Sequence, residues 1–105
     1  MHTKFSDLGR FSDPSLLILS SLASGPKHGY AMMQDIEEFS GTRLEAGTLY
    51  GALARLERSG WIEPLPTEER RRPYRITAAG VLALREQLTT MNQIVSVGLQ
   101  RLSPS

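Results

Sequence analysis

Arginine is concentrated in one short segment of the chain, and its guanidinium group suits the binding of phosphates and base edges. Four arginines stand within six residues, without an acidic residue among them: Arg70, Arg71, Arg72 and Arg75. Glu68 and Glu69 come directly before them. The run Arg70–Arg72 therefore either contacts the phosphates or minor groove of a nucleic acid, or forms a solvated loop paired with these glutamates. The net charge of the chain is only +1, so its distribution is more informative than its total.

The other reactive side chains do not form a catalytic or metal-binding set. The chain has no cysteine, which excludes disulfides, thiolate metal sites and thiol nucleophiles. Its two histidines are His2 and His28, and we expect His28 to have a structural role at a helix start. No Ser/His/Asp set or phosphate-binding glycine loop is visible in the sequence. We therefore expect no enzyme activity, no cofactor and no metal.

Length and composition are typical of one soluble domain. The chain has 105 residues, of which 40% are hydrophobic and 22% charged. A domain of this size buries only about two thirds of its unfolded surface, so self-association would add useful burial. No apolar run approaches the roughly 18 residues of a membrane span, and Met1–Arg10 lacks the apolar stretch of a secretory signal. We therefore expect a cytoplasmic protein without a membrane partner.

Two helices are predicted in the first part of the chain. The first begins at Pro14, with Asp13 as its cap, and ends before Gly25-Pro26. Its many apolar neighbours indicate a central, largely buried helix. The second is expected to run from His28-Gly29 to Phe39. Its inward face is predicted to hold Met33, Ile36 and Phe39, and its outward face Asp35, Glu37 and Glu38.

A third helix, expected over about residues 46–59, has a buried stripe and an opposite face that suits DNA. The stripe consists of Leu49, Ala52, Leu53 and Leu56. At 100° per residue, the opposite face holds Gly47, Gly51, Ala54 and Arg58, with Thr48 and Arg55 on one flank and Tyr50 on the other. Small side chains would let the helix backbone approach base edges, while the hydroxyls could donate to phosphates. Because a helical glycine costs roughly 1 kcal/mol relative to alanine, Gly51 indicates a close partner, a tight helix crossing or simple tolerance.

The arginine-rich segment falls in a predicted β-hairpin. Two β-type segments, Trp61–Leu65 and Pro73–Thr77, flank the polar loop Pro66–Arg72. Three helices followed by a hairpin are the layout of a winged helix, whose third helix enters the major groove while the hairpin touches the flanking backbone. We therefore expect a mainly α fold with a small β-hairpin. The winged helix-turn-helix domain would cover residues 1–77, with its wing at about 61–77.

A long last helix is expected from residue 78 to about 102, within a C-terminal segment 78–105. Its apolar residues recur in steps of three and four, interrupted at Gly98: Val81, Leu84, Leu88, Met91, Val95 and Leu102. The helix extends past what a three-helix core can bury, which favours a dimerisation helix over an amphipathic cover of its own domain.

Several stretches of the chain resemble the PadR family of bacterial regulators. They are His28-Gly29-Tyr30, Gly47-Thr48-Leu49-Tyr50, Ala52-Leu53-Ala54-Arg55-Leu56-Glu57, and Arg72-Pro73-Tyr74-Arg75-Ile76-Thr77 with Ala79-Gly80. The resemblance covers about residues 14–84. It implies a winged-helix homodimer that represses transcription, binds double-stranded operator DNA and often releases it when a small effector binds. It also implies that the third helix and the wing contact DNA and that the last helix pairs the subunits.

The chain departs from the family pattern at three places. Glu45-Ala46 stand where the family commonly has a capping residue and a proline, and Glu45 is a poorer cap that puts a negative charge near DNA. Gly51 stands where proline is frequent in the family, so the start of the helix is less rigid. The C-terminal segment has no aromatic residue, so we do not expect a flat ligand stacked between paired last helices.

The sequence thus predicts a DNA interface made of the third helix, the wing and the start of the second helix. Its candidate residues are Tyr30, Gly47, Thr48, Tyr50, Gly51, Ala54, Arg55, Arg70, Arg71, Arg72 and Arg75. Tyr30 either binds phosphate or packs on the first helix, and Arg75 is either a phosphate contact or plainly exposed. Trp61 is expected in the core rather than in an effector pocket. The competing function is a winged helix in which Arg70–Arg72 bind an acidic protein, and the choice between repressor and activator stays open.

Overall fold

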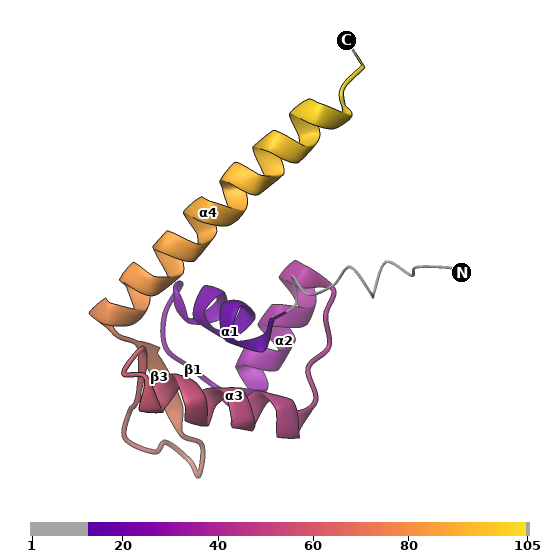
Figure 1. The fold of residues 1–105 in the computed structure, drawn as a ribbon. Coiled ribbons are helices and arrows are strands. Elements are labelled where there is room, and N and C mark those ends of the chain that lie inside the picture. The colour runs from indigo at the N-terminus through magenta and orange to yellow at the C-terminus, as the bar shows by residue number, and fades with distance from the viewer. Residues whose placement is uncertain (1–12, 105) are drawn as a thin grey trace.

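The computed structural model describes residues 13–104 of the chain (Figure 1). The expectation for Met1–Arg10 lies outside the described residues. The elements are, in order, α1 (Pro14–Leu22), β1 (Lys27–His28), α2 (Gly29–Ser40), α3 (Ala46–Arg58), β2 (Ile62–Pro64), β3 (Pro73–Ile76) and α4 (Ala78–Leu102). The predicted mainly α fold with a small β element is confirmed. No helix among the described residues is both long enough and apolar enough to span a membrane.

Helix α1 is the centre of the hydrophobic core. Asp13 caps it, since its Oδ1 accepts a hydrogen bond of 2.8 Å from the Ser15 amide, and Pro14 occupies the first turn. The buried residues Leu16–Leu19 occupy all sides of the helix. Such a helix is stable only when other elements surround it, and α2, α3, β3 and α4 all contact α1 (Figure 1).

Helix α2 has nearly the predicted bounds, and its faces are as predicted except at Phe39 and Asp35. Met32 and Ile36 are fully buried, whereas Phe39, which we expected to face inward, is 50% exposed. Phe39 lies seven residues after Met32 on the same side of the helix, but in the last turn, where the core does not cover it. Asp35, expected to face outward, is instead partly covered because its Oδ2 accepts a hydrogen bond of 2.7 Å from the hydroxyl of buried Ser21.

The sheet contains a strand that the sequence analysis missed. Strand β1 pairs antiparallel with β3, with Lys27 opposite Tyr74, and β2 pairs with the other edge of β3, with Glu63 opposite Arg75. The order in the sheet is therefore β1-β3-β2. A strand of two residues is too short to show the alternation by which strands are recognised in a sequence. Its pairing ties the start of α2 to the wing, because β1 leads directly into α2.

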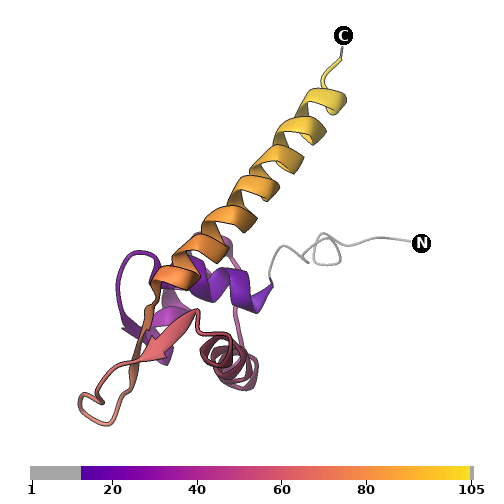
Figure 2. The ribbon, with the colours of Figure 1, turned by 60° about the vertical axis from the view of Figure 1, so that its left-hand side comes forward.

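Helix α4 begins against the sheet and then leaves the domain. The Thr77 hydroxyl accepts from the Gly80 amide at 3.1 Å, and a side chain on Gly80 would collide with the Trp61 carbonyl. Trp61 is partly buried and packs on the core, as expected. Beyond its first turns the helix projects away from the domain in both views (Figures 1 and 2). The radius of gyration is accordingly 15.6 Å, against about 13 Å for a compact domain of this length.

The predicted apolar stripe of α4 divides between the core and the surface. Leu84 is only 6% exposed and belongs to the core of its own chain, and Met91 packs against that core. Leu84 therefore has little surface left for a second subunit. Val95 and Leu102 are 52% and 82% exposed. The distal half of the helix is thus the part whose apolar side chains lack cover from their own chain.

Candidate nucleic-acid interface

Helix α3 has the two faces that the sequence predicts. Its stripe of Leu49, Ala52, Leu53 and Leu56 is buried in the core. The residues of the opposite face and its flanks are all exposed: Gly47, Thr48, Gly51, Ala54, Arg55 and Arg58. The exposed face therefore has only very small side chains along its middle and arginines at its C-terminal end.

The two glycines of α3 stand in open space. A Cβ atom added to Gly47 would have no heavy atom within 4 Å outside its neighbouring residues and the helix backbone, and one added to Gly51 would meet only the Arg55 Nη1 atom at 3.9 Å. Among the described residues, then, no tight helix crossing requires Gly51. Of the explanations given above, a close approach by an external partner and simple tolerance remain.

The first backbone amides of α3 have no capping side chain. Glu45 occupies the N-cap position, and its carboxylate makes no capping hydrogen bond. The first turn has no acidic residue. The partial positive charge of a helix N-terminus is therefore not neutralised by a side chain within the helix itself. The free amides can donate to an anion such as a DNA phosphate, although the charge of the Glu45 carboxylate opposes it.

Tyr50 connects α3 to the start of α2. A Cβ atom on Gly29 would lie 2.5 Å from the Tyr50 hydroxyl oxygen and 3.2 Å from Leu49 Cδ2. Gly29 is buried, and its missing side chain lets the Tyr50 ring lie over the first turn of α2 while about half of Tyr50 stays exposed. Tyr50 is a predicted interface residue, whereas the sequence does not predict this role of Gly29. The juxtaposition of His28-Gly29 with Tyr50 follows only from the tertiary packing.

Tyr30 points into solvent. Its side chain is 57% exposed, and its hydroxyl accepts a hydrogen bond of 3.3 Å from Gln34 Nε2 one turn later in α2. The hydroxyl of Tyr30 is therefore available to a partner outside the chain, as one of its two alternatives requires.

The wing ends in a tight turn. Glu68 and Arg71 exchange two backbone hydrogen bonds of 2.7 Å, and the two residues between them, Glu69 and Arg70, have φ angles of 47° and 68°. Two successive residues with positive φ are typical of a type I′ hairpin turn, whose twist matches that of the flanking strands. The turn places Arg70 at the tip and Arg71 on the strand side that faces β1.

The wing arginines are not neutralised by the neighbouring glutamates. In residues 13–104 the ion pairs are Lys27–Asp35 and Arg75–Glu63. Instead, Arg71 Nη1 lies 3.3 Å from His28 Nε2, and Arg72 Nη1 donates to the Leu65 carbonyl at 3.2 Å. The alternative of a loop paired with Glu68 and Glu69 is therefore wrong for Arg70–Arg72.

Arg75 is exposed, as one of its two alternatives has it, and it pairs with a glutamate of the neighbouring strand. Its Nε donates to Glu63 Oε1 at 2.9 Å, and its Nη2 pairs with the same oxygen. The pair follows from the register, in which Glu63 stands opposite Arg75. Both side chains are about half exposed, so the pair adds little to stability, but it occupies the guanidinium. We therefore leave Arg75 out of the interface proposed below.

Tyr74 lies where the sheet meets α3. Burial raises the pKa of its phenol, the nearby Glu57 carboxylate raises it further, and the Arg72 guanidinium opposes both. The phenol is thus held in its protonated, uncharged form. Since Tyr74 also packs on the core, it supports the wing from below rather than extending the exposed surface.

The exposed face of α3 and the tip of the wing lie at the same end of the molecule. In both views this is the end opposite to the C-terminus of α4 (Figures 1 and 2). A helix whose exposed face has small side chains can enter a major groove, while a basic hairpin beside it contacts the adjacent phosphate backbone.

Comparison with known sequences identifies the family. The sequence model described as "Transcriptional regulator PadR-like family" matches residues 18–86. The chain belongs to the PadR-like family of transcriptional regulators. The predicted resemblance is therefore confirmed, and the family is one of transcriptional regulators.

Similar proteins agree with this assignment. A transcriptional regulator from Clostridium thermocellum is 27% identical with a TM-score of 0.76, covering 98% of this chain and 100% of that one. A PadR family transcription regulator from Clostridium difficile R20291 is 28% identical with a TM-score of 0.77, over 86% and 98% of the two chains. The fold is a winged helix-turn-helix domain with a long C-terminal helix, as predicted.

A curated relative is more similar in sequence but much longer. An uncharacterized 37.1 kDa protein in transposon TN4556 of Streptomyces fradiae is 45% identical over 85 residues. The match covers 81% of this chain and 25% of the relative. The present chain therefore spans about a quarter of the length of that relative.

Among residues 13–104, no group of three or more His, Cys, Asp and Glu side chains could hold a metal ion.

Proposed function

We propose that this chain is a sequence-specific repressor that binds a pseudo-palindromic operator as a homodimer. Each subunit places the exposed face of α3 in a major groove and the tip of its wing on the flanking backbone. The observation that carries the proposal is the open space around Gly47 and Gly51 on the exposed face of α3. The chain does not fill this space itself, so another macromolecule can occupy it.

The small residues of α3 act by letting the helix approach closely. With Gly47, Gly51 and Ala54 facing the groove, the backbone can lie nearer to the bases than larger side chains would allow. These residues offer few side-chain hydrogen bonds, so direct base readout depends on Thr48 and Arg55 at the flank. Part of the specificity then comes from DNA shape and deformability.

Phosphate contacts come from the start of α3, from Tyr50 and from the wing. The uncapped first turn of α3 accepts a phosphate, and the exposed Tyr50 hydroxyl donates to another. Arg70 and Arg71 extend from the turn of the wing, where guanidinium groups reach phosphates or a minor groove. Such contacts fix the protein on the duplex and make its affinity depend on salt.

The homodimer is supported by the distal half of α4. A groove of about 320 Å³ there is lined by Met91, Ile94, Val95, Gly98, Leu99 and Leu102. Ile94 and Leu99 are 61% and 64% exposed, and neither belongs to the predicted stripe, because the exposed apolar face is wider than one heptad seam. A row of exposed aliphatic side chains on a helix of 25 residues is stable in water when a second such helix covers it.

Release by a small effector is the last part of the proposal. A cleft of about 490 Å³ between the end of α1 and α4 is lined by Ile76, Val81, Leu84, Arg85 and Leu88, among others. A ligand there would touch both the winged-helix domain and the proposed dimerisation helix. It would thereby alter the angle between the two copies of α3, which must match the spacing of the half-sites.

Fluorescence anisotropy tests the proposal. The purified protein is titrated into labelled duplexes from the promoter regions beside its own gene, at several salt concentrations and with random duplex as competitor. The proposal predicts salt-sensitive, selective binding with one dimer per site, and block of transcription from the bound promoter by polymerase in vitro. Absence of binding at low salt would contradict DNA binding and favour a protein partner of the wing, and increased transcription would contradict repression.

A further inference from the structure

We propose that His28 is a positioning residue of the DNA interface. Its neutral imidazole either caps α2 or accepts a hydrogen bond from Arg71 of the wing, and its protonated form does neither. This inference rests on the proposed DNA binding, because Arg71 is one of its proposed phosphate contacts. It goes beyond that function by naming the residue that controls when Arg71 is free to act.

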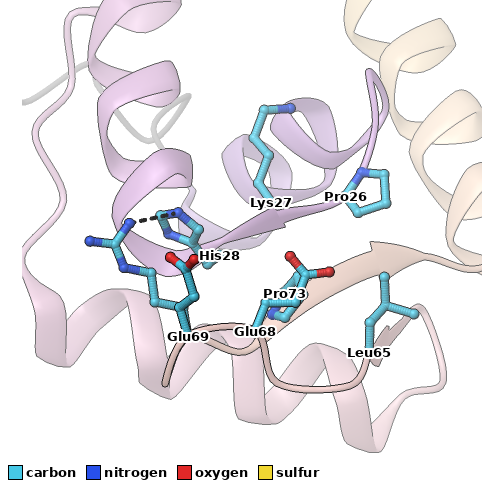
Figure 3. Close-up of a pocket in the computed structure, with 8 residues that line it drawn as sticks. Pro26, Lys27, His28, Leu65, Glu68, Glu69 and Pro73 are labelled. Carbon is cyan, nitrogen blue, oxygen red and sulfur yellow. Dashed lines mark hydrogen bonds between the residues drawn. The ribbon is translucent and has the colours of Figure 1, made fainter.

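Two hydrogen-bond donors lie within reach of one ring, and Figure 3 shows the bond between His28 and the guanidinium of the wing. The Ala31 amide lies 3.4 Å from His28 Nδ1, and Arg71 Nη1 lies 3.3 Å from His28 Nε2. A neutral imidazole has one nitrogen that accepts and one that donates, and neither the amide nor the guanidinium can accept. The ring therefore satisfies only one of the two donors at a time, and its tautomer decides which.

The two states of the ring have different consequences. With the proton on Nδ1, the ring holds Arg71 and leaves the first turn of α2 without its cap. With the proton on Nε2, the ring caps α2 through the Ala31 amide, and Arg71 is free to bind elsewhere. When Arg71 moves to a DNA phosphate, the cap of α2 is restored. Binding by the wing and order at the start of α2 are thus linked through His28.

Protonation removes both hydrogen bonds. An imidazolium has two N–H donors and no acceptor, and it repels the Arg71 guanidinium. The charged groups that share the cleft of about 850 Å³ with His28 are Lys27 from β1 and Glu68, Glu69 and Arg71 from the wing, and the Tyr50 hydroxyl of α3 lies beside the adjacent Gly29. The protonated ring therefore frees Arg71 and adds a positive charge next to it. Operator affinity should therefore rise when the His28 ring is protonated.

A pH profile of operator binding is the first test. Between pH 8 and pH 6 at constant ionic strength, we expect the operator affinity of the wild type to rise roughly threefold to tenfold. In His28→Asn it should change by less than about twofold, because asparagine keeps the N-cap but does not titrate. His2→Asn removes the other histidine and should retain the wild-type profile. The same profile in the wild type and His28→Asn would overturn the proposal.

Nitrogen NMR of the imidazole in the free protein is the second test, and it needs no DNA. At pH 8, Arg71→Ala should shift the ring toward the tautomer with the proton on Nε2, because only the Ala31 amide then competes for the acceptor. Arg70→Ala, at the adjacent position, should leave the tautomer ratio unchanged. An unchanged ratio in Arg71→Ala would overturn the inference by itself. A shifted ratio in a protein that binds no duplex at any pH would instead contradict the proposed function.

Discussion

The exposed face of α3 and the distal half of α4 are both left uncovered by their own chain, but their surfaces differ in chemistry. The face of α3 opposite its buried stripe and one flank consist of glycines, an alanine, a threonine and arginines. The distal half of α4 exposes large aliphatic side chains such as Ile94, Val95 and Leu99. Both helices have apolar residues at helical spacing and leave one face exposed, so neither periodicity nor exposure distinguishes their roles.

The difference indicates what kind of partner each helix meets. Small residues offer little apolar area to bury. They let DNA approach the backbone of the helix and its arginines closely. Aliphatic side chains gain free energy only when another apolar surface removes them from water. We therefore assign α3 to DNA and the end of α4 to a second copy of the chain. The following substitutions test that division.

A charge in the distal groove of α4 should have the largest effect. Val95→Glu would bury a carboxylate in the proposed dimer interface, so we expect monomers in light scattering and a loss of operator affinity of about 100-fold or more, because the two half-sites are no longer bound together. Gln93→Glu adds the same charge at an exposed polar position and should leave the dimer intact. Persistence of a dimer in Val95→Glu would place the interface elsewhere.

A large side chain on the exposed face of α3 should have the next largest effect on operator affinity. Gly51→Leu would hold the helix away from the bases, and we expect operator affinity to fall about 10-fold to 100-fold. In contrast, the free energy of unfolding should rise by roughly 0.5–1 kcal/mol, because leucine is a better helix former than glycine and the position is open. Urea denaturation and anisotropy on the same samples would measure both. Unchanged affinity would remove α3 from the groove.

Removal of the wing arginines should weaken binding without changing its selectivity. Arg70→Ala with Arg71→Ala should lower the slope of log affinity against log salt by about one or two units, because both residues are proposed to neutralise phosphates. Arg85→Ala with Arg101→Ala removes the same charge from α4 and should leave the slope unchanged. Equal slopes in all three proteins would contradict the assignment of the wing to the phosphate backbone.

The smallest effect is expected from a single hydroxyl. Tyr50→Phe should weaken binding to operator and random duplex alike by about 1 kcal/mol, since it removes one phosphate donor without changing the packing on Gly29. Tyr74→Phe removes a hydroxyl from the less exposed tyrosine of β3 and should leave the affinity unchanged. Wild-type affinity in Tyr50→Phe would exclude Tyr50 from the interface.

The helices could be predicted because their signals are local. Asp13-Pro14, Gly41, Gly60 and Thr77 mark ends through the chemistry of caps and stops, and the stripe of α3 follows from its period alone. The bare face of α3 was predictable for the same reason. The family pattern then gave these elements a functional meaning.

The errors concern contacts that depend on distant parts of the chain. The ion pair of Arg75 requires the register of β2 and β3, and Arg71 meets His28 across 43 residues of sequence. Leu84 has the same spacing as the association residues, but it lies in the part of α4 that α1 and the sheet cover. The sequence gives the period of such residues, whereas the fold decides which neighbour each one meets.

Chemical footprinting of the operator tests the central claim most directly. With the dimer bound, we predict that guanine N7 atoms in two major-groove segments, centred about one helical turn apart and related by two-fold symmetry, are protected from methylation. This protection should disappear in Gly51→Leu at a concentration that still occupies the DNA. Protection confined to the minor groove, or a major-groove pattern that Gly51→Leu leaves unchanged, would contradict the assignment of α3 as the element that reads the operator.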